Sequence, residues 1–323
     1  MLYPLKFYPI LKEKIWGGSK LKTILNKPLE KEKIGESWEI STVGTEVSVV
    51  SNGEFAGRRL DDIIRECKAE LLGKKVYQEF GDQFPLLIKF IDAQEDLSVQ
   101  LHPNDELAKK RHNSYGKTEM WYVVQAAQDS KLIVGFNKDT TREEYERFLN
   151  NRKITELLNF DSILEGDSYF IKAGTIHAIG KGALIAEIQQ TSDITYRVYD
   201  WDRKDDNGIQ RELHTELALE ALDFNKSNSS KLIYDDTVNS TNEVVSSIYF
   251  TTSSIEIDGR FERDYKDLDS FKILMCVKGS GTIYTKDNST SIEVGETLLI
   301  PAKIKHILIE SNAQKMKLLE VYI

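Results

Sequence analysis

The chain has 323 residues, of which 40% are hydrophobic and 29% charged, and its formal net charge is −9 at pH 7. This composition is typical of a globular protein in water, and the length suffices for two or three packed units. Because the balance is acidic and no dense basic patch appears, we expect no nucleic-acid partner. No segment approaches the apolar length of a membrane helix, so we expect no membrane partner either.

The two cysteines, Cys67 and Cys276, lie far apart and in dissimilar surroundings. They form no CxxC motif, so the sequence predicts a reducing compartment and no disulfide framework. Proline and lysine residues interrupt the first eleven positions, which show no secretory pattern. A cytoplasmic location is therefore the expected default.

In chain order, the first clear pattern is an alternation of apolar and polar residues over 36–52, which predicts two strands joined near Gly44. Residues 59–80 then have helical spacing. The residues on the apolar face of this stretch are Leu60, Ile63, Ile64, Cys67 and Leu71.

Two further helical blocks follow. The first begins near residue 140, where Thr141 and Glu144 stand in the relation of a capping box. The second is predicted over 212–222, where apolar residues recur at helical spacing.

Two stretches of the chain carry side chains of the kinds that bind metal ions. The first is Ser98-Val99-Gln100-Leu101-His102-Pro103, followed by Gly116-Lys117-Thr118-Glu119, and the second runs from Gly166 to His177. Gln100 and His102 are two residues apart, so on a strand they point to the same face. Two imidazoles, one carboxylate and one amide oxygen form a mixed set suited to zinc or a similar divalent ion. The combination predicts a metalloenzyme built on a β-barrel.

The three other histidines lack such a setting. His112 lies in a charged stretch that reads as a solvated loop, and His214 lies at the expected start of a helix. His306 ends a segment that repeats the one ending at His177, since both run from glycine and an acidic residue through an apolar strand and a turn to histidine. Such self-similarity indicates two copies of one supersecondary unit.

The repeated pattern resembles the second conserved motif of the cupin superfamily, and the segment 277–281 resembles the glycine turn of a cupin barrel. This resemblance implies a mainly β fold of two cupin-like jelly-roll barrels with helical insertions. The second copy has no histidine or glutamate where Gln100, His102 and Glu119 would fall, so we expect it to support the first.

Polar runs at 225–230 and 235–243 place the boundary between the two units near residue 235. The prediction is a catalytic cupin domain with helical insertions at 1–235. A cupin-like domain without metal ligands is expected at 236–323.

The motifs also resemble, in the same order, those of the type I phosphomannose isomerases, in their short bacterial form. The segments that carry this resemblance are Ile15-Trp16-Gly17-Gly18, Gly35-Glu36-Ser37-Trp38-Glu39, 98–103, 116–119, 173–178 and 187–198. The resemblance implies an enzyme that interconverts mannose 6-phosphate and fructose 6-phosphate with one divalent metal ion per chain, zinc being favoured. It implies a small-molecule sugar phosphate as the partner.

The resemblance also assigns residues to roles. It implies that Gln100, His102, Glu119 and His177 are the metal ligands. It implies further that Arg197 is catalytic and binds substrate, that Lys117 and Glu187 line the same pocket, and that Ser98 lies near the substrate phosphate.

The chemistry limits what these residues can do. Moving a carbonyl from C1 to C2 requires removal of a carbon-bound proton and gives an enediolate, whose negative charge needs a cation. Arg197 carries a permanent positive charge suited to the enediolate or the phosphate, but it is a poor base. The proton shuttle stays open between Glu187, a water on the metal and Lys117.

Plainer interpretations stand beside these roles. Alternation along the strand around residue 197 also fits a surface position for Arg197, and Lys117 would serve as well to balance the charge of Glu119. Trp16 and Trp38 read as packing residues. Two other functions fit a cupin: an iron(II) oxygenase with two histidines and a carboxylate, and a non-catalytic sugar-binding barrel.

Overall fold

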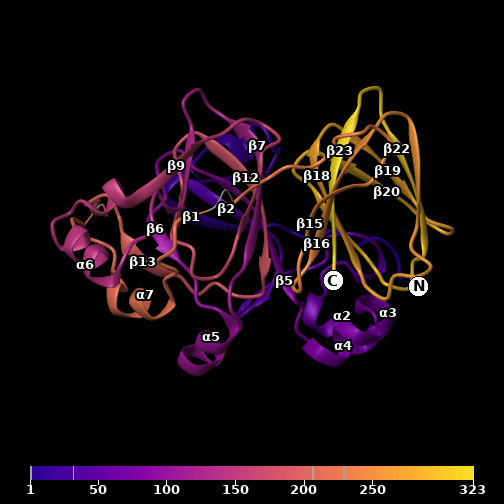
Figure 1. Cartoon of the computed structure of the whole chain (residues 1–323). Coiled ribbons are helices and arrows are strands. Elements are labelled where there is room, and N and C mark those ends of the chain that lie inside the picture. The colour runs from indigo at the N-terminus through magenta and orange to yellow at the C-terminus, as the bar shows by residue number, and fades with distance from the viewer. Residues whose placement is uncertain (1, 32, 206, 228–229) are drawn as a thin grey trace.

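The computed structural model describes residues 2–31, 33–205, 207–227 and 230–323. Within these ranges the strands form two pairs of sheets, which lie side by side in Figure 1, and one short hairpin. The strands of these sheets pair in antiparallel fashion, and many of the paired strands, such as β5 and β12, are far apart in the sequence. The prediction of a mainly β fold is confirmed.

The first pair comes from the N-terminal two thirds of the chain. Its seven-stranded sheet contains, in spatial order, β1 (Ile10–Gly18), β2 (Ile34–Ile40), β5 (Leu86–Asp92), β12 (Ala183–Gln190), β7 (Glu119–Ala126), β10 (Ser168–Ile171) and β14 (Lys231–Leu232). Its five-stranded sheet contains β13 (Tyr196–Tyr199), β6 (Val99–Leu101), β11 (His177–Ile179), β8 (Lys131–Phe136) and β9 (Leu158–Ser162). The hairpin consists of β3 (Thr42–Val43) and β4 (Glu46–Val47).

The second pair follows in the C-terminal third. One sheet contains β15 (Asn242–Ser246), β16 (Thr251–Ile257), β23 (Met316–Tyr322), β18 (Lys272–Lys278) and β21 (Thr297–Ile300). The other contains β17 (Arg260–Asp264), β22 (His306–Ser311), β19 (Ser280–Tyr284) and β20 (Ser289–Glu293).

The helices lie between these strands. They are α1 (Lys20–Thr23), α2 (Leu60–Cys67), α3 (Ala69–Leu72), α4 (Lys74–Phe80), α5 (Asp105–His112), α6 (Arg142–Asn150) and α7 (Thr215–Ala221), with 3₁₀ turns at Gly53–Phe55 and Ile154–Leu157. None of them, over the described ranges, is both long and apolar enough to cross a membrane.

The resemblance to cupins implied two jelly-roll barrels, and these are not confirmed. Among the described residues the hydrogen-bonded pairs give open sheets, with β1 and β14 at the edges of one and β13 and β9 at the edges of the other. The two sheets of the first pair are held together by side chains. Trp121 and Ile185 of the seven-stranded sheet share a buried cluster with Val134 and Ile179 of the five-stranded sheet.

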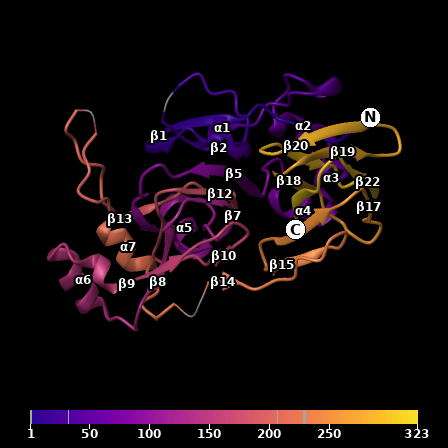
Figure 2. The same ribbon diagram turned by 90° about the horizontal axis from the view of Figure 1, so that it is seen from above.

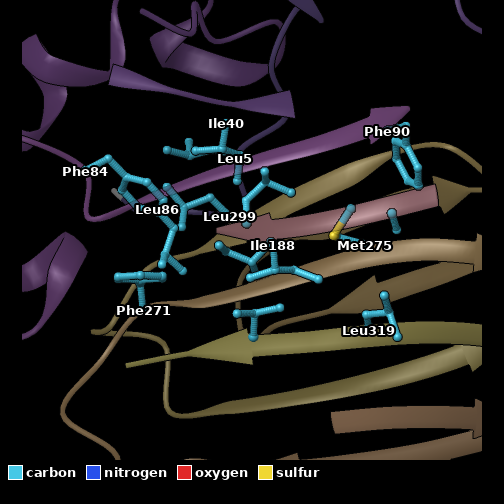
Figure 3. Packing of buried hydrophobic residues seen from close by; sticks show 14 of the residues in the cluster. Leu5, Ile40, Phe84, Leu86, Phe90, Ile188, Phe271, Met275, Leu299 and Leu319 are labelled. Atoms are coloured by element: carbon cyan, nitrogen blue, oxygen red, sulfur yellow. The ribbon is translucent and has the colours of Figure 1, made fainter. Parts of the chain in front are cut away.

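The central strands of the seven-stranded sheet are buried on both faces. Every residue of β5 and β12 is buried, and the period of two along a strand sends neighbours to opposite sides. Phe90 and Ile188 therefore face outward from the first pair, where they meet Met275 and Leu319 of the second pair in one apolar cluster (Figure 3). The two pairs of sheets thus share a core.

The beginning of the chain also crosses to the second pair. Leu5 and Leu299 exchange two backbone hydrogen bonds of 2.9 Å each. In Figure 1 the N-terminus and helices α2–α4 accordingly lie beside the strands of the second pair, and Figure 2 shows the same neighbourhood from above.

Several predicted elements are confirmed with changed limits. The strands at 36–52 form, with their turn at Gly44. The helical stretch 59–80 is present but divided into three helices, because Lys68 and Gly73 adopt positive φ angles of 49° and 94°. The helix predicted over 212–222 is shorter, covering Thr215–Ala221.

The internal repeat is a repeated crossing between facing sheets. In the first copy β10 lies in the seven-stranded sheet, and the chain re-enters the opposite sheet at His177, the first residue of β11. In the second copy β21 and β22 do the same, and His306 begins β22. Of the polar run predicted at 225–230, residues 228 and 229 lie outside the described part.

Candidate active site and metal centre

Three predicted site residues lie in one row across the five-stranded sheet. Gln100 of β6 is paired directly with His177 of β11 on one side and with Arg197 of β13 on the other. Directly paired residues point to the same face of a sheet. The row therefore presents all three side chains to one side, where the seven-stranded sheet contributes Glu119 from β7.

His102, Glu119 and His177 converge in the interior. The Nε2 atom of His102 lies 3.1 Å from Glu119 Oε1, and the Nε2 atom of His177 lies 3.9 Å from Glu119 Oε2. One ligand atom from each residue falls within 4.8 Å of the others. The three side chains are about 1% exposed, so they are shielded from water.

The backbone orients both imidazoles. Nδ1 of His102 lies 2.8 Å from the carbonyl oxygen of Ile194, and Nδ1 of His177 lies 2.8 Å from that of Thr175. With Nδ1 engaged in this way, Nε2 is the atom left to bind a metal. The buried Nε2 of His177 makes no hydrogen bond within the described part of the chain, and two such nitrogens with a carboxylate fit a divalent cation.

The electrostatic surroundings favour the protonation states that a metal requires. Burial, together with Lys117, lowers the pKa of His102 to about 4, and burial also lowers the pKa of His177. Burial acts to raise the pKa of Glu119, but Lys117 and the two histidines outweigh it and hold that pKa well below its usual range. Neutral imidazoles and an ionised carboxylate are the forms that coordinate metal.

Lys117 lies against the same atoms. Its Nζ is 2.5 Å from Glu119 Oε1 and 3.0 Å from His102 Nε2. A single positive charge thus already sits beside the carboxylate, as expected for a position that attracts cations.

Glu187 lies on the face of the seven-stranded sheet that is turned toward the five-stranded sheet, as Glu119 does. Across the strands, Glu187 is paired with Lys89 of β5 and with Trp121 of β7. Its Oε2 lies 3.0 Å from Lys89 Nζ, and its Oε1 accepts a hydrogen bond of 2.9 Å from Trp121 Nε1. The need of a buried carboxylate for a partner is met by these two donors.

Further charged residues of the seven-stranded sheet lie next to Lys89, on β2 and on the edge strand β1. Glu36 of β2 accepts a 2.7 Å hydrogen bond from Trp38 Nε1 and lies 3.1 Å from Lys14 Nζ. Burial acts to raise the pKa of Glu36, but Lys89 and Lys14 outweigh it and bring that pKa to about 2. Lys89 in turn keeps a raised pKa despite its burial, because Glu187 and Glu36 flank it.

These groups surround a cavity of about 180 Å³ between the two sheets of the first pair. The residues lining it are Lys14, Trp16, Glu36, Trp38, Lys89, Ile91, Leu97, Ser98, Gln100, Lys117, Trp121, His177, Ile179, Glu187, Asp193, Thr195, Arg197 and Arg211. The interpretation of Trp16 and Trp38 as packing residues was therefore incomplete, because both also form walls of this cavity.

Arg197 is not a solvent-facing strand residue. It is partly buried, its Nε lies 3.3 Å from Ser98 Oγ, and its Nη1 donates to the carbonyl of Glu212 at 2.8 Å. Its guanidinium is therefore held at the cavity wall. Arg211, which also lines the cavity, donates to Asp200 Oδ2 at 2.7 Å.

The structure thus brings together the eight residues that the sequence singled out. They lie at the three-residue cluster or at the cavity: Ser98, Gln100, His102, Lys117, Glu119, His177, Glu187 and Arg197. The hydroxyl of Ser98 donates a hydrogen bond of 3.2 Å to Gln100 Oε1. His306 does not belong to the site, since it is 59% exposed on the second pair of sheets.

Sequence reasoning missed Lys14, Glu36, Lys89 and Arg211. The signal that could have found Lys89 is the one that found Glu187, a charged residue interrupting an apolar strand.

Two family models match the chain. Residues 5–146 match the catalytic domain of type I phosphomannose isomerase, and residues 239–322 match the cupin domain of mannose-6-phosphate isomerase.

Relatives match over nearly the whole chain. A probable mannose-6-phosphate isomerase of Bacillus subtilis is 34% identical over 98% of this chain and 99% of its own length. A mannose-6-phosphate isomerase of Streptococcus mutans is 35% identical over 94% of both chains. The crystal structure of the mannose 6-phosphate isomerase from Bacillus subtilis covers 100% of both chains with a TM-score of 0.89 and 32% identity. The chain therefore belongs to the type I phosphomannose isomerase family.

Proposed function

We propose that the chain is a metal-dependent aldose–ketose isomerase that interconverts mannose 6-phosphate and fructose 6-phosphate through an enediolate. The observation that carries this proposal is the meeting of His102, Glu119 and His177 beside a cavity that also holds Arg197. Family membership supplies the substrate, because relatives over the full length carry that activity in their names.

The proposed metal site consists of His102, Glu119, His177 and Gln100. The first three converge directly, and Gln100 is the residue paired with His177 across the sheet. A divalent cation bound there would polarise the sugar carbonyl and stabilise negative charge on oxygen, and zinc suits this nitrogen and oxygen donor set.

The proposed binding of the anionic sugar phosphate rests on local charge. Although the whole chain carries a net charge of −9, the cavity is lined by several lysines and arginines. Arg197 offers forked donors to a phosphate or an enediolate oxygen, and Ser98 adds a hydroxyl at the same wall.

The proton transfer between C1 and C2 needs a group that can gain and lose a proton inside the cavity. Both oxygens of Glu187 are already engaged, by Lys89 and Trp121, so taking up a proton there would weaken a buried ion pair. Lys117 lies beside the proposed metal ligands and also lines the cavity, so its Nζ can exchange a proton with a substrate bound there. These contacts favour Lys117 for proton transfer and Glu187 for holding substrate hydroxyls.

Three finer points belong to the same proposal. We propose that residues 1–235 form the catalytic unit and 236–323 a cupin-like unit without metal ligands, supported by the separate match of a cupin model to 239–322. We also propose that each pair of sheets is a jelly roll, and this proposal rests on the resemblance to cupins and on the same cupin model. A cytoplasmic location also stays a proposal, and it rests on the two cysteines that the sequence places far apart and outside any CxxC motif.

The test is a coupled assay of mannose 6-phosphate conversion with the protein as purified, after chelation and after zinc is restored. We expect activity to disappear with the chelator and to return with zinc. Arg197→Ala should lower kcat/KM by about 100-fold, the usual scale for a lost charge-stabilising donor, while Arg147→Ala on the exposed face of α6 serves as the matched control. Full activity after complete removal of metal would contradict the proposed mechanism. No activity with zinc bound would contradict the proposed substrate.

A further inference from the structure

The segment that carries Lys117 and Glu119 is held in place by hydrogen bonds from its backbone. Three consecutive backbone amides, those of residues 116–118, donate hydrogen bonds to groups outside the segment. The acceptors are, in order, Asp105 Oδ1 at 2.8 Å, the carbonyl of Pro103 at 3.1 Å and Gln190 Oε1 at 2.9 Å.

The carboxylate of Asp105 joins these contacts into one network. Its Oδ1 also accepts from Gln190 Nε2 at 3.0 Å, and its Oδ2 accepts from the hydroxyl of Tyr249 at 3.0 Å. Asp105 is the first residue of α5 and follows His102 by three positions, whereas Tyr249 lies between β15 and β16 of the second pair of sheets. The Asp105 side chain thus connects the start of α5 with the segment 116–119, the end of β12 and the other pair of sheets.

The segment 116–118 approaches the backbone at the start of α5 so closely that residue 116 must be a glycine. A Cβ atom at Gly116 would lie 2.5 Å from the amide nitrogen of Asp105 and 2.6 Å from the carbonyl carbon of Asn104. Both are backbone atoms, which cannot move aside as a flexible side chain could. Only glycine lets the segment approach the start of α5 closely enough for these bonds to form.

The consequence falls on the two side chains that face the site. Lys117 and Glu119 are two residues apart on an extended segment, so they share a face. Their charged ends meet each other at 2.5 Å and His102 at 3.0 Å and 3.1 Å. A displacement of the backbone by as little as 1 Å can cost on the order of 100-fold in rate when reacting groups are moved.

We propose that Asp105, Gln190 and Tyr249 form a positioning network for the isomerisation, which holds Lys117 and Glu119 in register with His102. This inference rests on the proposed function. It gives the second pair of sheets a part in the site although that pair contributes none of the proposed metal ligands, because the outermost member of the network is Tyr249. The three residues act through Lys117 and Glu119 and do not touch the reacting atoms.

The test compares Tyr249→Phe, Asp105→Ala and Asp105→Asn in the full-length zinc-loaded protein. Tyr234→Phe is the matched control, because that hydroxyl bonds to the carbonyl of Gly166 at 2.6 Å and does not contact residues 116–118. We measure kcat, KM, the thermal unfolding midpoint, and zinc affinity by competition with a chelating indicator.

The expected result separates positioning from general stability. Asp105→Ala should lower kcat by about 10-fold and zinc affinity by about 10-fold, with KM within twofold, because Arg197 and Ser98 on the opposite sheet are untouched. Asp105→Asn keeps an oxygen for the amide of Gly116 and should recover part of both losses. Tyr249→Phe should lower kcat by about threefold, and the control should change neither quantity.

Unchanged kcat and zinc affinity in Asp105→Ala would overturn the network. So would losses that follow the unfolding midpoint and appear equally in the control. If the unmodified protein shows no isomerase activity, the proposed function fails, and the zinc competition still decides whether the network positions Glu119.

Discussion

At the scale of single residues, burial alone does not determine the charge of a lysine. Lys89 and Lys272 are both buried. Lys89 has a raised pKa because Glu187 and Glu36 flank it and outweigh its burial. For Lys272, burial outweighs the attraction of Glu320, whose carboxylate is already engaged by Arg263 at 2.6 Å and 3.0 Å, and lowers the pKa to about 7.

Lys272 should therefore make stability depend on pH. Its pKa in the folded state, about 7, lies below the ordinary value of 10.5, so the unfolded chain binds more protons between those values and stability rises with pH there. The cost of burying the charge is fully present below pH 7. From pH 7 to pH 9 the free energy of unfolding should gain about 2 kcal/mol from this group.

The measurement is denaturant unfolding at pH 7, 8 and 9. Lys272→Met should remove the gain, since the carbonyls of Pro301 and Ile304 that Nζ contacts do not titrate. Lys266→Met, at a 72% exposed position, should keep it. Equal pH profiles for Lys272→Met and the unmodified protein would show that Lys272 stays charged throughout.

At the scale of elements, local sequence signals predicted where helices occur better than they predicted the residues at which each helix begins and ends. The apolar face predicted over 59–80 is largely buried, but positive φ angles divide the helix at Lys68 and Gly73. The start of α6 is as predicted, because the hydroxyl of Thr141 accepts a hydrogen bond of 3.2 Å from the amide of Glu144. The carboxylate of Glu144 pairs with Lys138 at 2.8 Å, which differs from the reciprocal bond of a capping box.

Thr141→Ala should lower the free energy of unfolding by about 1 kcal/mol, because it removes the acceptor for an otherwise unpaired helix amide. Thr45→Ala, at an exposed turn outside any helix start, is the control and should change little. Isomerase activity should be retained in both variants, since α6 does not line the cavity. A loss equal to that of the control would mean that Thr141 does not cap α6.

At the scale of the whole molecule, the two pairs of sheets share one core. Residues from β5, β7 and β12 pack with residues from β18, β21 and β23 in a single cluster, and the beginning of the chain pairs with Leu299. A core that is continuous across both pairs predicts cooperative unfolding of the two as one unit.

Leu319→Ala tests this coupling. Leu319 is fully buried in the shared cluster, so the truncation should cost about 2–5 kcal/mol. The four tryptophans, Trp16, Trp38, Trp121 and Trp201, all lie in the first pair of sheets or its connections. Tryptophan fluorescence and far-ultraviolet circular dichroism should therefore shift to the same lower midpoint. A fluorescence midpoint unchanged from the unmodified protein would show that the pairs unfold independently.

The sequence by itself determined the mainly β fold, the repeated unit and the motif residues. Spacing of two in an extended segment predicts one face for Gln100 and His102, and His102 follows directly after the end of β6 at Leu101. Imidazole and carboxylate side chains indicate metal binding by their type. The order of the motifs was enough to indicate the family, which the comparisons confirm.

Tertiary structure decided the rest. A lysine or glutamate alternating on a strand normally faces water, so the alternation by itself does not distinguish Lys14 or Glu36 from a solvated residue. They belong to the site only because a second sheet, formed by residues distant in sequence, covers that face and encloses the cavity. The contact of Tyr249 with Asp105 spans 144 positions, and local spacing carries no information about such a pair because loop closure brings it together only in the folded chain.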